Sequence, residues 1–505
     1  MDLKTPESGF AARRGSCWLN LKTMLQASPV EAGGAELERG LSARAALGLN
    51  IIDMVGVGPF VTLPLIVIAM GGPQAMLGWL LGALLSLCDG LVWSELGTTY
   101  PEAGGSYVYL RKLYGEKGLG QAVSFLYAWQ LLFSAPLSIA SGCLGFSQYM
   151  SYFFPRSGER LWSFTVLHVP VVFSGQTLMA MALCCTALVI LYRKIRSLDR
   201  LMRWLGGAVV LALLAIIVTG LTHFHAKLAF DFPAGSFHLG PAFFAGLGAG
   251  MLISAYDYWG YYNVCFLGAE VRDPRRTIPL AVLGSIAIVG TLYLLMNISV
   301  LGVLPWHDLT GNLNGDARMF TMAVFMQRAY GAGAGAHGAA VAIVVLIALA
   351  ASASVLALLL GYSRIPYAAA KSGNFPAVFA KVHPKHHIPH VSLLTLGGMT
   401  LFCCLFRLQE VITTLVVIRI LFQFLAQGIA VLLPRHRRAR RERGAKSFRM
   451  PLYPLPVVLA LCGFLFILVS RPNFLREMRT AGVILAAGAL VYGVRMWRGV
   501  AEARG

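Results

Sequence analysis

Two acidic side chains stand inside apolar stretches of the sequence, where a charge is energetically expensive. Asp53 lies three residues before Gly56, and Asp257 lies three residues before Gly260. A carboxylate at the depth of a bilayer is a candidate functional group by default. Such a group can bind a cationic solute or carry a proton. The structural alternative, a hydrogen bond to the backbone of a broken helix, stays open for both residues.

The first apolar run contains several residues that interrupt a helix. Gly56, Gly58, Pro59 and Pro64 follow one another closely. Proline lacks a backbone donor, and glycine tolerates irregular backbone. Inside a membrane, a broken helix is tolerated only where the freed groups are buried in protein or line a cavity. The amides after the break would then form an anion site at the start of a half-helix.

The second interruption lies in the stretch Ser254–Pro279, which begins in an apolar run and ends in a basic loop. Tyr256, Trp259 and neighbouring tyrosines crowd around Asp257, with Gly260 among them. This combination predicts a helix that breaks near the membrane midplane, where carbonyls and aromatic rings can face a small solute. Ordinary packing of the aromatic side chains is the alternative.

Composition identifies the class of protein. The chain has 505 residues, of which 57% are hydrophobic and only 13% are charged. Soluble proteins carry about twice that charged fraction, so we expect an all-α polytopic membrane protein. The net charge of +20 does not indicate nucleic-acid binding. The basic residues instead fall in alternate loops, as membrane topology requires.

Apolar runs of about 20 residues predict about twelve transmembrane helices. The excess of Lys and Arg in the loops after even-numbered spans predicts that both termini are cytoplasmic. The two breaks fall in spans one and six, and this offset of five predicts an inverted repeat. We therefore divide the sequence into an N-terminal cytoplasmic tail (1–43), a first repeat of spans one to five (44–222), a second repeat of spans six to ten (240–434), a basic cytoplasmic loop (435–450) and spans eleven and twelve (451–498).

Other polar residues in the spans have simpler explanations. Asp89 could pair with Arg419 of span ten, although a packing role is favoured. Glu95 and Glu270 lie near cytoplasmic ends, where we expect pairing with basic loops. The nine cysteines show neither a disulfide framework nor metal-ligand spacing. The histidines at 383, 386, 387 and 390 favour a protonatable loop over a metal site.

Four motifs resemble those of the amino acid–polyamine–organocation (APC) transporter family. They are Gly56–Phe60, Ser94–Leu110, Gly268–Pro279 and Ser363–Pro376, in the order and spacing of that family. The resemblance covers most of residues 45–440. It implies a LeuT-like fold of five plus five helices with two peripheral helices, and a solute site between broken helices one and six.

The resemblance also assigns roles to individual positions. The amides of Val57 and Gly58 would hold a substrate carboxylate, and carbonyls near Tyr256 and Trp259 would hold the amino group. Tyr256 would be the aromatic gate. Val57 replaces the serine of the family motif, which removes a hydroxyl donor. Span five, 205–221, lacks the lysine that proton-coupled relatives often carry.

These observations predict a secondary active transporter or exchanger of amino acids in a cell membrane (plasma or inner). A polyamine or organic-cation transporter of the same family is the alternative, a non-transporting amino acid sensor is less favoured, and an enzyme least of all. We expect H+ or Na+ coupling, no cofactor, no metal and no nucleic acid. No disulfide-linked heavy chain is expected, because residues 151–170 lack cysteine.

The predicted site comprises nine substrate-binding residues and, for ion or proton coupling, the two aspartates again with two serines. The substrate-binding residues are Asp53, Gly56, Val57, Gly58, Ser254, Tyr256, Asp257, Trp259 and Gly260. The coupling residues are Asp53, Asp257, Ser352 and Ser354. Small residues at helix interfaces would explain Ser352 and Ser354 as well.

Overall fold

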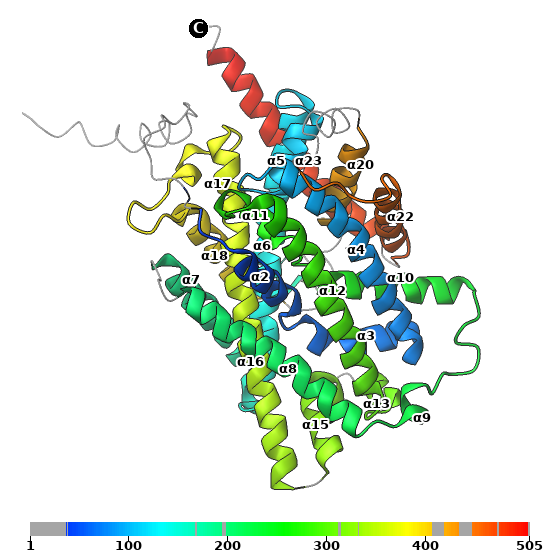
Figure 1. Cartoon of the computed structure of the whole chain (residues 1–505). Helices are drawn as coiled ribbons and strands as arrows, with labels where there is room; N and C mark the ends of the chain where they lie inside the picture. Colours follow the sequence, from blue (N-terminus) through cyan, green and yellow to red (C-terminus); the bar gives the residue numbers. More distant parts are fainter. Residues whose placement is uncertain are drawn as a thin grey trace, which may run out of the picture.

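The computed structural model describes residues 37, 39–166, 169–193, 198–311, 315–331, 333–406, 419–433, 447–471 and 474–502. The predicted tail at 1–43 and the basic loop at 435–450 therefore lie largely outside the described residues. Most of the described chain is helical, and the long helices pack side by side (Figure 1).

The first apolar run forms two helices, α2 (Ala43–Val55) and α3 (Gly58–Met70), which meet at a bend of 44°. Gly56 ends α2 with a φ of +41°, a backbone conformation that favours glycine. Pro59 follows at the start of α3, where its missing N–H is no loss because the first turn of a helix has no intrahelical acceptor for it. The predicted interruption is therefore present, and glycine and proline cause it.

The second interruption separates α10 (Pro241–Tyr258) from the short helix α11 (Asn263–Phe266). Gly260, with a φ of +119°, turns the chain between them. A Cβ atom on Gly260 would lie 2.7 Å from the Met54 nitrogen and 2.8 Å from the Asp53 carbonyl carbon. The two broken segments thus touch backbone to backbone, and only glycine fits at this crossing.

Side chains from neighbouring elements satisfy several of the backbone groups that the breaks set free. Asn50 of α2 donates to the carbonyl of Tyr261 and accepts from the amide of Val264 at 3.0 Å. The hydroxyl of Tyr293 donates to the carbonyl of Met54 at 2.8 Å. These bonds connect the first break to the second and to a third helix, as buried irregular backbone requires.

The remaining elements surround the two broken pairs, with α12 beside α4 and α16 beside α6 (Figure 1). The other long or apolar helices are α4 (Met76–Thr99), α6 (Leu119–Met150), α7 (Gly175–Tyr192), α8 (Leu198–Thr222), α12 (Pro274–Leu301), α16 (Ala334–Tyr362), α18 (His390–Cys403), the π-helical stretch η5 (Ile420–Ala426) continuing into α20 (Gln427–Leu432), α22 (Leu455–Val469) and α23 (Phe474–Glu502). Shorter elements connect them: η1 (Pro73–Ala75), α5 (Ser106–Tyr114), η2 (Pro155–Gly158), α9 (Ala226–Ala229), η3 (Gly268–Glu270), α13 (Trp306–Thr310), α14 (Asp316–Met319), α15 (Thr321–Tyr330), α17 (Arg364–Lys371) and η4 (Ala377–Ala380).

The helix lengths confirm a polytopic helical membrane protein. Seven helices in the described part of the chain are long and apolar enough to cross a membrane, and the bent pair α2–α3 makes an eighth. Three shorter apolar helices, at 390–403, 420–432 and 455–469, add to these. The total of about twelve spans and the inverted repeat stay predictions.

Two segments between the long helices have secondary structure of their own. The segment at 155–174 contains an antiparallel strand pair, β1 (Arg160–Val166) with β2 (Val169–Ser174). The segment from Pro305 to Gly335 contains α13, α14 and α15. In α15, Met322, Phe325 and Met326 are buried at helical spacing. A search for runs long enough to span a membrane overlooks such a short amphipathic helix.

Candidate substrate site

A pocket lies where the two broken helices cross. Its walls come from both breaks, from α6 and α16, and from the residue that precedes η5. The lining residues are Asp53, Met54, Gly56, Val57, Gly58, Ser138, Ser141, Gly142, Tyr256, Asp257, Trp259, Gly260, Ser354, Leu358, Tyr362 and Arg419. The cavity volume of about 40 Å³ suits a few water molecules or a small polar solute. The structure thus brings together every predicted substrate-binding residue except Ser254.

Asp53 lies in the last turn of α2, at the edge of the first break. Its Oδ2 accepts a hydrogen bond from Asn263 Nδ2 at 2.8 Å, across the helix crossing. The Ser354 hydroxyl of α16 donates to the Asp53 backbone carbonyl at 3.5 Å. Oδ1 has no hydrogen-bond partner among the described residues. One carboxylate oxygen is therefore held by the fold, and the other is available to a ligand.

Asp257 lies beside the first turn of α3. The Thr62 hydroxyl donates to its Oδ2. A Cβ placed on Gly58 would overlap its Oδ1, which has no hydrogen-bond partner among the described residues. The amides of Val57 and Gly58 also donate to no described acceptor. The carboxyl group therefore stands beside a helix N-terminus, where an anion is stabilised.

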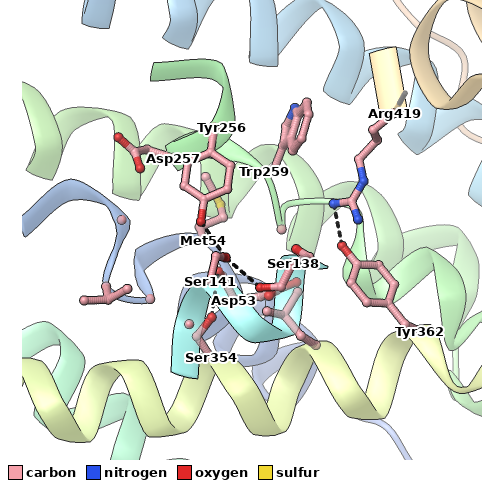
Figure 2. A pocket seen from close by; sticks show the side chains of 16 residues that line it. Asp53, Met54, Ser138, Ser141, Tyr256, Asp257, Trp259, Ser354, Tyr362 and Arg419 are labelled. Carbon is pink, nitrogen blue, oxygen red and sulfur yellow. Dashed lines mark hydrogen bonds between the residues drawn. The ribbon is translucent and has the colours of Figure 1, made fainter. Parts of the chain in front are cut away.

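Tyr256 spans the pocket from α10 to α6. Its hydroxyl lies 2.8 Å from that of Ser141, which in turn donates to the Ser138 carbonyl at 2.7 Å. Its ring contacts that of Trp259 edge to face, with centroids 6.3 Å apart. Figure 2 shows Tyr256 beside Asp257, with its hydroxyl directed at Ser141. Tyr256, which the sequence predicted to be a gate, thus forms part of the pocket wall.

Arg419 is the main residue that the sequence analysis did not place in the site. Its side chain is 1% exposed and donates to the Tyr362 hydroxyl at 2.7 Å and to the Ser134 carbonyl at 3.3 Å. The guanidinium carbon lies 5.2 Å from the centroid of Trp259, a distance typical of a cation–π contact. No acidic side chain of the described chain forms an ion pair with it. Asp257 and Arg419 lie at opposite sides of the pocket (Figure 2).

The suggested pairing of Arg419 with Asp89 is wrong. Asp89 instead accepts a hydrogen bond of 2.5 Å from the Tyr261 hydroxyl. This contact fits the favoured packing role, because it anchors the second break to α4. Aromatic rings and a carbonyl surround the guanidinium in place of a carboxylate. The one sequence feature that pointed to Arg419 was its position within an apolar run.

Two predicted serines lie outside the pocket. Ser254 donates to the Gly78 carbonyl of α4 at 2.8 Å. Its side chain faces Gly82, where α4 and α10 pack closely enough that a Cβ would overlap the serine. Ser352 donates to the Ala348 carbonyl of its own helix at 2.8 Å. Of the predicted coupling serines, Ser354 alone lines the pocket.

An ion pair links two elements at the end of the bundle where α2 begins. Arg364 of α17 donates to both carboxylate oxygens of Glu270, at 2.8 and 3.1 Å. The amides of Gly40 and Leu41 donate to the Glu270 carbonyl at 3.0 and 2.9 Å. Glu270 was expected to pair with a basic loop, and it pairs with Arg364 of the basic segment after span eight, which is helical in the structure. A bidentate ion pair and backbone hydrogen bonds therefore connect the elements at this end.

Other predicted groups carry no ligand site in the described residues. No group of three or more His, Cys, Asp or Glu side chains there could hold a metal ion. The eight described cysteines form no disulfide bond, and Cys17 lies outside the described residues. Glu95 accepts a hydrogen bond from the Met450 amide at 2.7 Å. Ser138, Ser141 and Tyr362 also line the pocket, and nothing in the sequence singled them out.

A sequence profile of the amino acid permease family matches residues 41–488, which include every residue of the pocket. The chain belongs to this family. Its members are transporters, a class of membrane protein in which solute sites commonly lie between broken helices. Small-molecule amino acids and the lipid bilayer are accordingly the partners of the family.

Several transporters resemble this permease along most of its length. Cationic amino acid transporter 4 from Homo sapiens is 28% identical over 392 residues, which are 77% of this chain and 58% of that protein. The serine/threonine exchanger SteT from Bacillus subtilis is 26% identical over 457 residues, covering 90% of this chain and 95% of the exchanger. The branched-chain amino acid permease BcaP from Lactococcus lactis is 25% identical over 438 residues, covering 85% and 88%.

The chain spans under two thirds of the length of several cationic amino acid transporters that it matches, from 58% to 66%. It spans nearly all of the bacterial exchanger and permease. The names of these relatives differ in the amino acid carried, so family membership alone leaves the substrate open.

Proposed function

We propose that this permease is a secondary active transporter or exchanger of small neutral amino acids, which works by alternating access. The observation that supports this most is the pocket between the two helix breaks, with carboxylates and a guanidinium in its walls. Free amides at one half-helix suit an anionic group, and a carboxylate oxygen without a partner suits an ammonium group. An amino acid carries both groups.

In the proposed binding mode, Asp53 Oδ1 and nearby carbonyls receive the substrate ammonium group. The amides of Val57 and Gly58 receive its carboxylate. Asp257 already stands at that half-helix, and two carboxylates in one buried site cannot both ionise easily. We therefore propose that Asp257 carries a proton when substrate binds, which couples transport to H+.

Arg419 supports a neutral substrate side chain. A second cation about 6 Å from a guanidinium would be repelled by about 3 kcal/mol at an effective dielectric constant of about 20. The small cavity of about 40 Å³ also favours short side chains. The relatives named for serine, threonine and branched-chain amino acids carry such side chains, whereas the cationic transporters do not.

A polyamine or other organic cation is the second candidate, and the position of Asp257 favours it. If Asp257 stays ionised, it fills the anion site at α3 by itself, and the substrate then needs no carboxylate. Asp53 and Asp257 would then both attract a diamine, but the positive charge of Arg419 would still repel it. We place this candidate second because of Arg419.

Thermal unfolding of the purified protein with added ligands separates the candidates. A ligand at 100 times its dissociation constant stabilises a protein by about 2.7 kcal/mol. The panel comprises serine, threonine, alanine, valine, lysine, arginine and putrescine. We expect neutral amino acids to raise the unfolding temperature, and Asp53→Asn to abolish the shift. Stabilisation by putrescine alone would favour the second candidate, and no response to any ligand would count against both.

Proton coupling requires a transport measurement. In proteoliposomes, we expect an inward pH gradient to accelerate uptake of the neutral amino acid that stabilises the protein. Asp257→Asn mimics the protonated carboxyl and should keep binding and exchange but lose acceleration by the gradient. If Asp257→Asn responds to the gradient as the wild type does, the proton is not carried at this position.

We further propose that the protein lies in the cell membrane with both termini in the cytoplasm. The basic loops after even-numbered spans support this orientation. Labelling of a cysteine placed in the β1–β2 hairpin of intact cells by an impermeant thiol reagent tests it. Labelling only after permeabilisation would contradict the orientation.

A further inference from the structure

A second, larger cavity opens beside α2 and α8, away from the substrate pocket. Its volume is about 1090 Å³. Its walls are the start of α2, the first half of α8, the end of α7 and the segments around residues 270 and 387. α2 and α8 pack against each other along this cavity (Figure 1). It lies at the same end of the bundle as the Glu270–Arg364 pair, whose two side chains form part of its wall.

One part of the cavity is apolar and follows the membrane-spanning helices. Leu211 and Leu214 of α8 are 55% and 43% exposed, although they lie in an apolar span. Gly48 of α2 and Gly207 of α8 face open space, because a Cβ on either would meet no atom within 4 Å. These glycines leave a groove between two spans that a hydrocarbon chain can enter from the bilayer.

The other part of the cavity is positively charged. Arg44, Arg193 and Arg272 line it, and none of them forms an ion pair with a described residue. Glu270 is the acidic side chain among the described residues that line it, and Arg364 already pairs with this carboxylate. This part of the cavity therefore offers, beside an apolar groove, three arginines that have no counter-ion among the described residues.

We propose that this cavity binds an anionic phospholipid. Its phosphate lies among Arg44, Arg193 and Arg272, and one acyl chain follows the groove between α2 and α8. Arginine suits a phosphate because its fork donates two parallel hydrogen bonds. Basic pockets between transmembrane helices at the cytoplasmic side favour lipid headgroups of this charge. A soluble phosphate would use the arginines but not the groove.

Unfolding temperatures in a neutral detergent test the proposal. Dioleoyl phosphatidylglycerol is added to the purified protein, with dioleoyl phosphatidylcholine and inorganic phosphate as separate comparisons. We expect phosphatidylglycerol to raise the unfolding temperature by several degrees, and the other two additives to have little effect. Equal shifts from both lipids, or an equal shift from inorganic phosphate, would overturn the proposal.

Filling the groove tests the acyl-chain position with a matched control. Gly207→Leu and Gly48→Leu place a side chain in the groove at positions where a Cβ meets no atom within 4 Å. Gly398→Leu introduces the same side chain on α18, where a Cβ also meets nothing within 4 Å and the residue does not line this cavity. The two groove variants should lose most of the phosphatidylglycerol shift, and Gly398→Leu should keep it. Retention of the shift in both groove variants would refute the groove.

Neutralising the headgroup site gives an independent test. The triple variant Arg44→Gln, Arg193→Gln, Arg272→Gln should lose the difference between the anionic and the neutral lipid. The control Arg275→Gln, Arg276→Gln removes two exposed arginines of α12 that do not line the cavity, and it should preserve that difference. Native mass spectrometry of each variant reports retained lipid directly, so a change in folding cannot imitate the result.

Discussion

We expect the Glu270–Arg364 ion pair to hold its end of the bundle closed, so that breaking the pair opens that end. The Arg364 side chain is only 4% exposed, and that of Glu270 is 18% exposed. Glu270→Gln leaves the guanidinium buried without its counter-charge, which costs about 3–5 kcal/mol in the closed conformation. We take the lower value of about 3 kcal/mol because Glu270 reaches some solvent. Opening this end hydrates Arg364, so the cost falls on the closed conformation alone.

A loss of about 3 kcal/mol shifts the equilibrium between closed and open conformations about 100-fold, since about 1.4 kcal/mol is a factor of ten. The assay is labelling of a cysteine introduced at Ser141, in the pocket, by an impermeant maleimide applied from the Arg364 end. The background is a variant without native cysteines. We expect the labelling rate to rise steeply in Glu270→Gln, up to the limit set by full opening.

Two controls separate opening from general instability. Glu270→Gln combined with Arg364→Gln removes both charges, so the unfolding temperature should recover relative to Glu270→Gln alone. The exchange Glu270→Arg with Arg364→Glu should restore slow labelling. If Glu270→Gln labels at the rate of the parent from this side, the ion pair does not hold this end closed, and the reasoning fails.

Three further predictions concern the site. Gly260→Ala forces a side chain into a positive φ and against the backbone at Met54, so we expect a loss of about 2–6 kcal/mol in stability and a lower unfolding temperature. Ser354→Ala should change the KM for substrate uptake, whereas Ser254→Ala, outside the pocket, should leave KM unchanged; equal effects would contradict the assignment. Arg419→Lys keeps the charge but cannot reproduce both hydrogen bonds and the ring contact. The apparent ligand affinity, measured from ligand-induced thermal stabilisation, should therefore fall at least tenfold. An unchanged affinity would show that charge alone suffices.

Much of the site could be predicted because residues close together in the sequence cause the helix breaks. Closely spaced glycines and prolines at residues 56–64 have few structural uses inside an apolar run, and the structure bends there by 44°. Asp53, Asp257 and Gly260 follow from the same reasoning, since charge and backbone freedom are unusual in a span. The family profile confirmed the transporter class, and the described helices confirmed the helical membrane fold.

The rest depends on contacts between residues far apart in the chain. The sequence offered Asp89 as a possible partner of Arg419, although a packing role for Asp89 was favoured, and the neighbours of Arg419 are Trp259 and Tyr362. Ser254 was included because it precedes the break, yet its side chain faces the glycines of α4. Which face of a helix meets the pocket is set by packing, and one sequence without periodic polarity does not reveal it.

The helix crossing at Gly260 and the side chains of the pocket wall are formed by different residues, so evolution can change the pocket without changing the crossing. The crossing of the two breaks is made by backbone atoms, with Met54 nitrogen and Asp53 carbon directly opposite Gly260, so no substitution there is free. Ser138, Ser141 and Leu358 line the pocket from α6 and α16 and take no part in that crossing. Selection for a new substrate can therefore replace these side chains one at a time while the crossing of the two broken helices stays intact. A library that randomises them should yield altered specificity at a useful frequency, whereas randomising position 260 should return glycine.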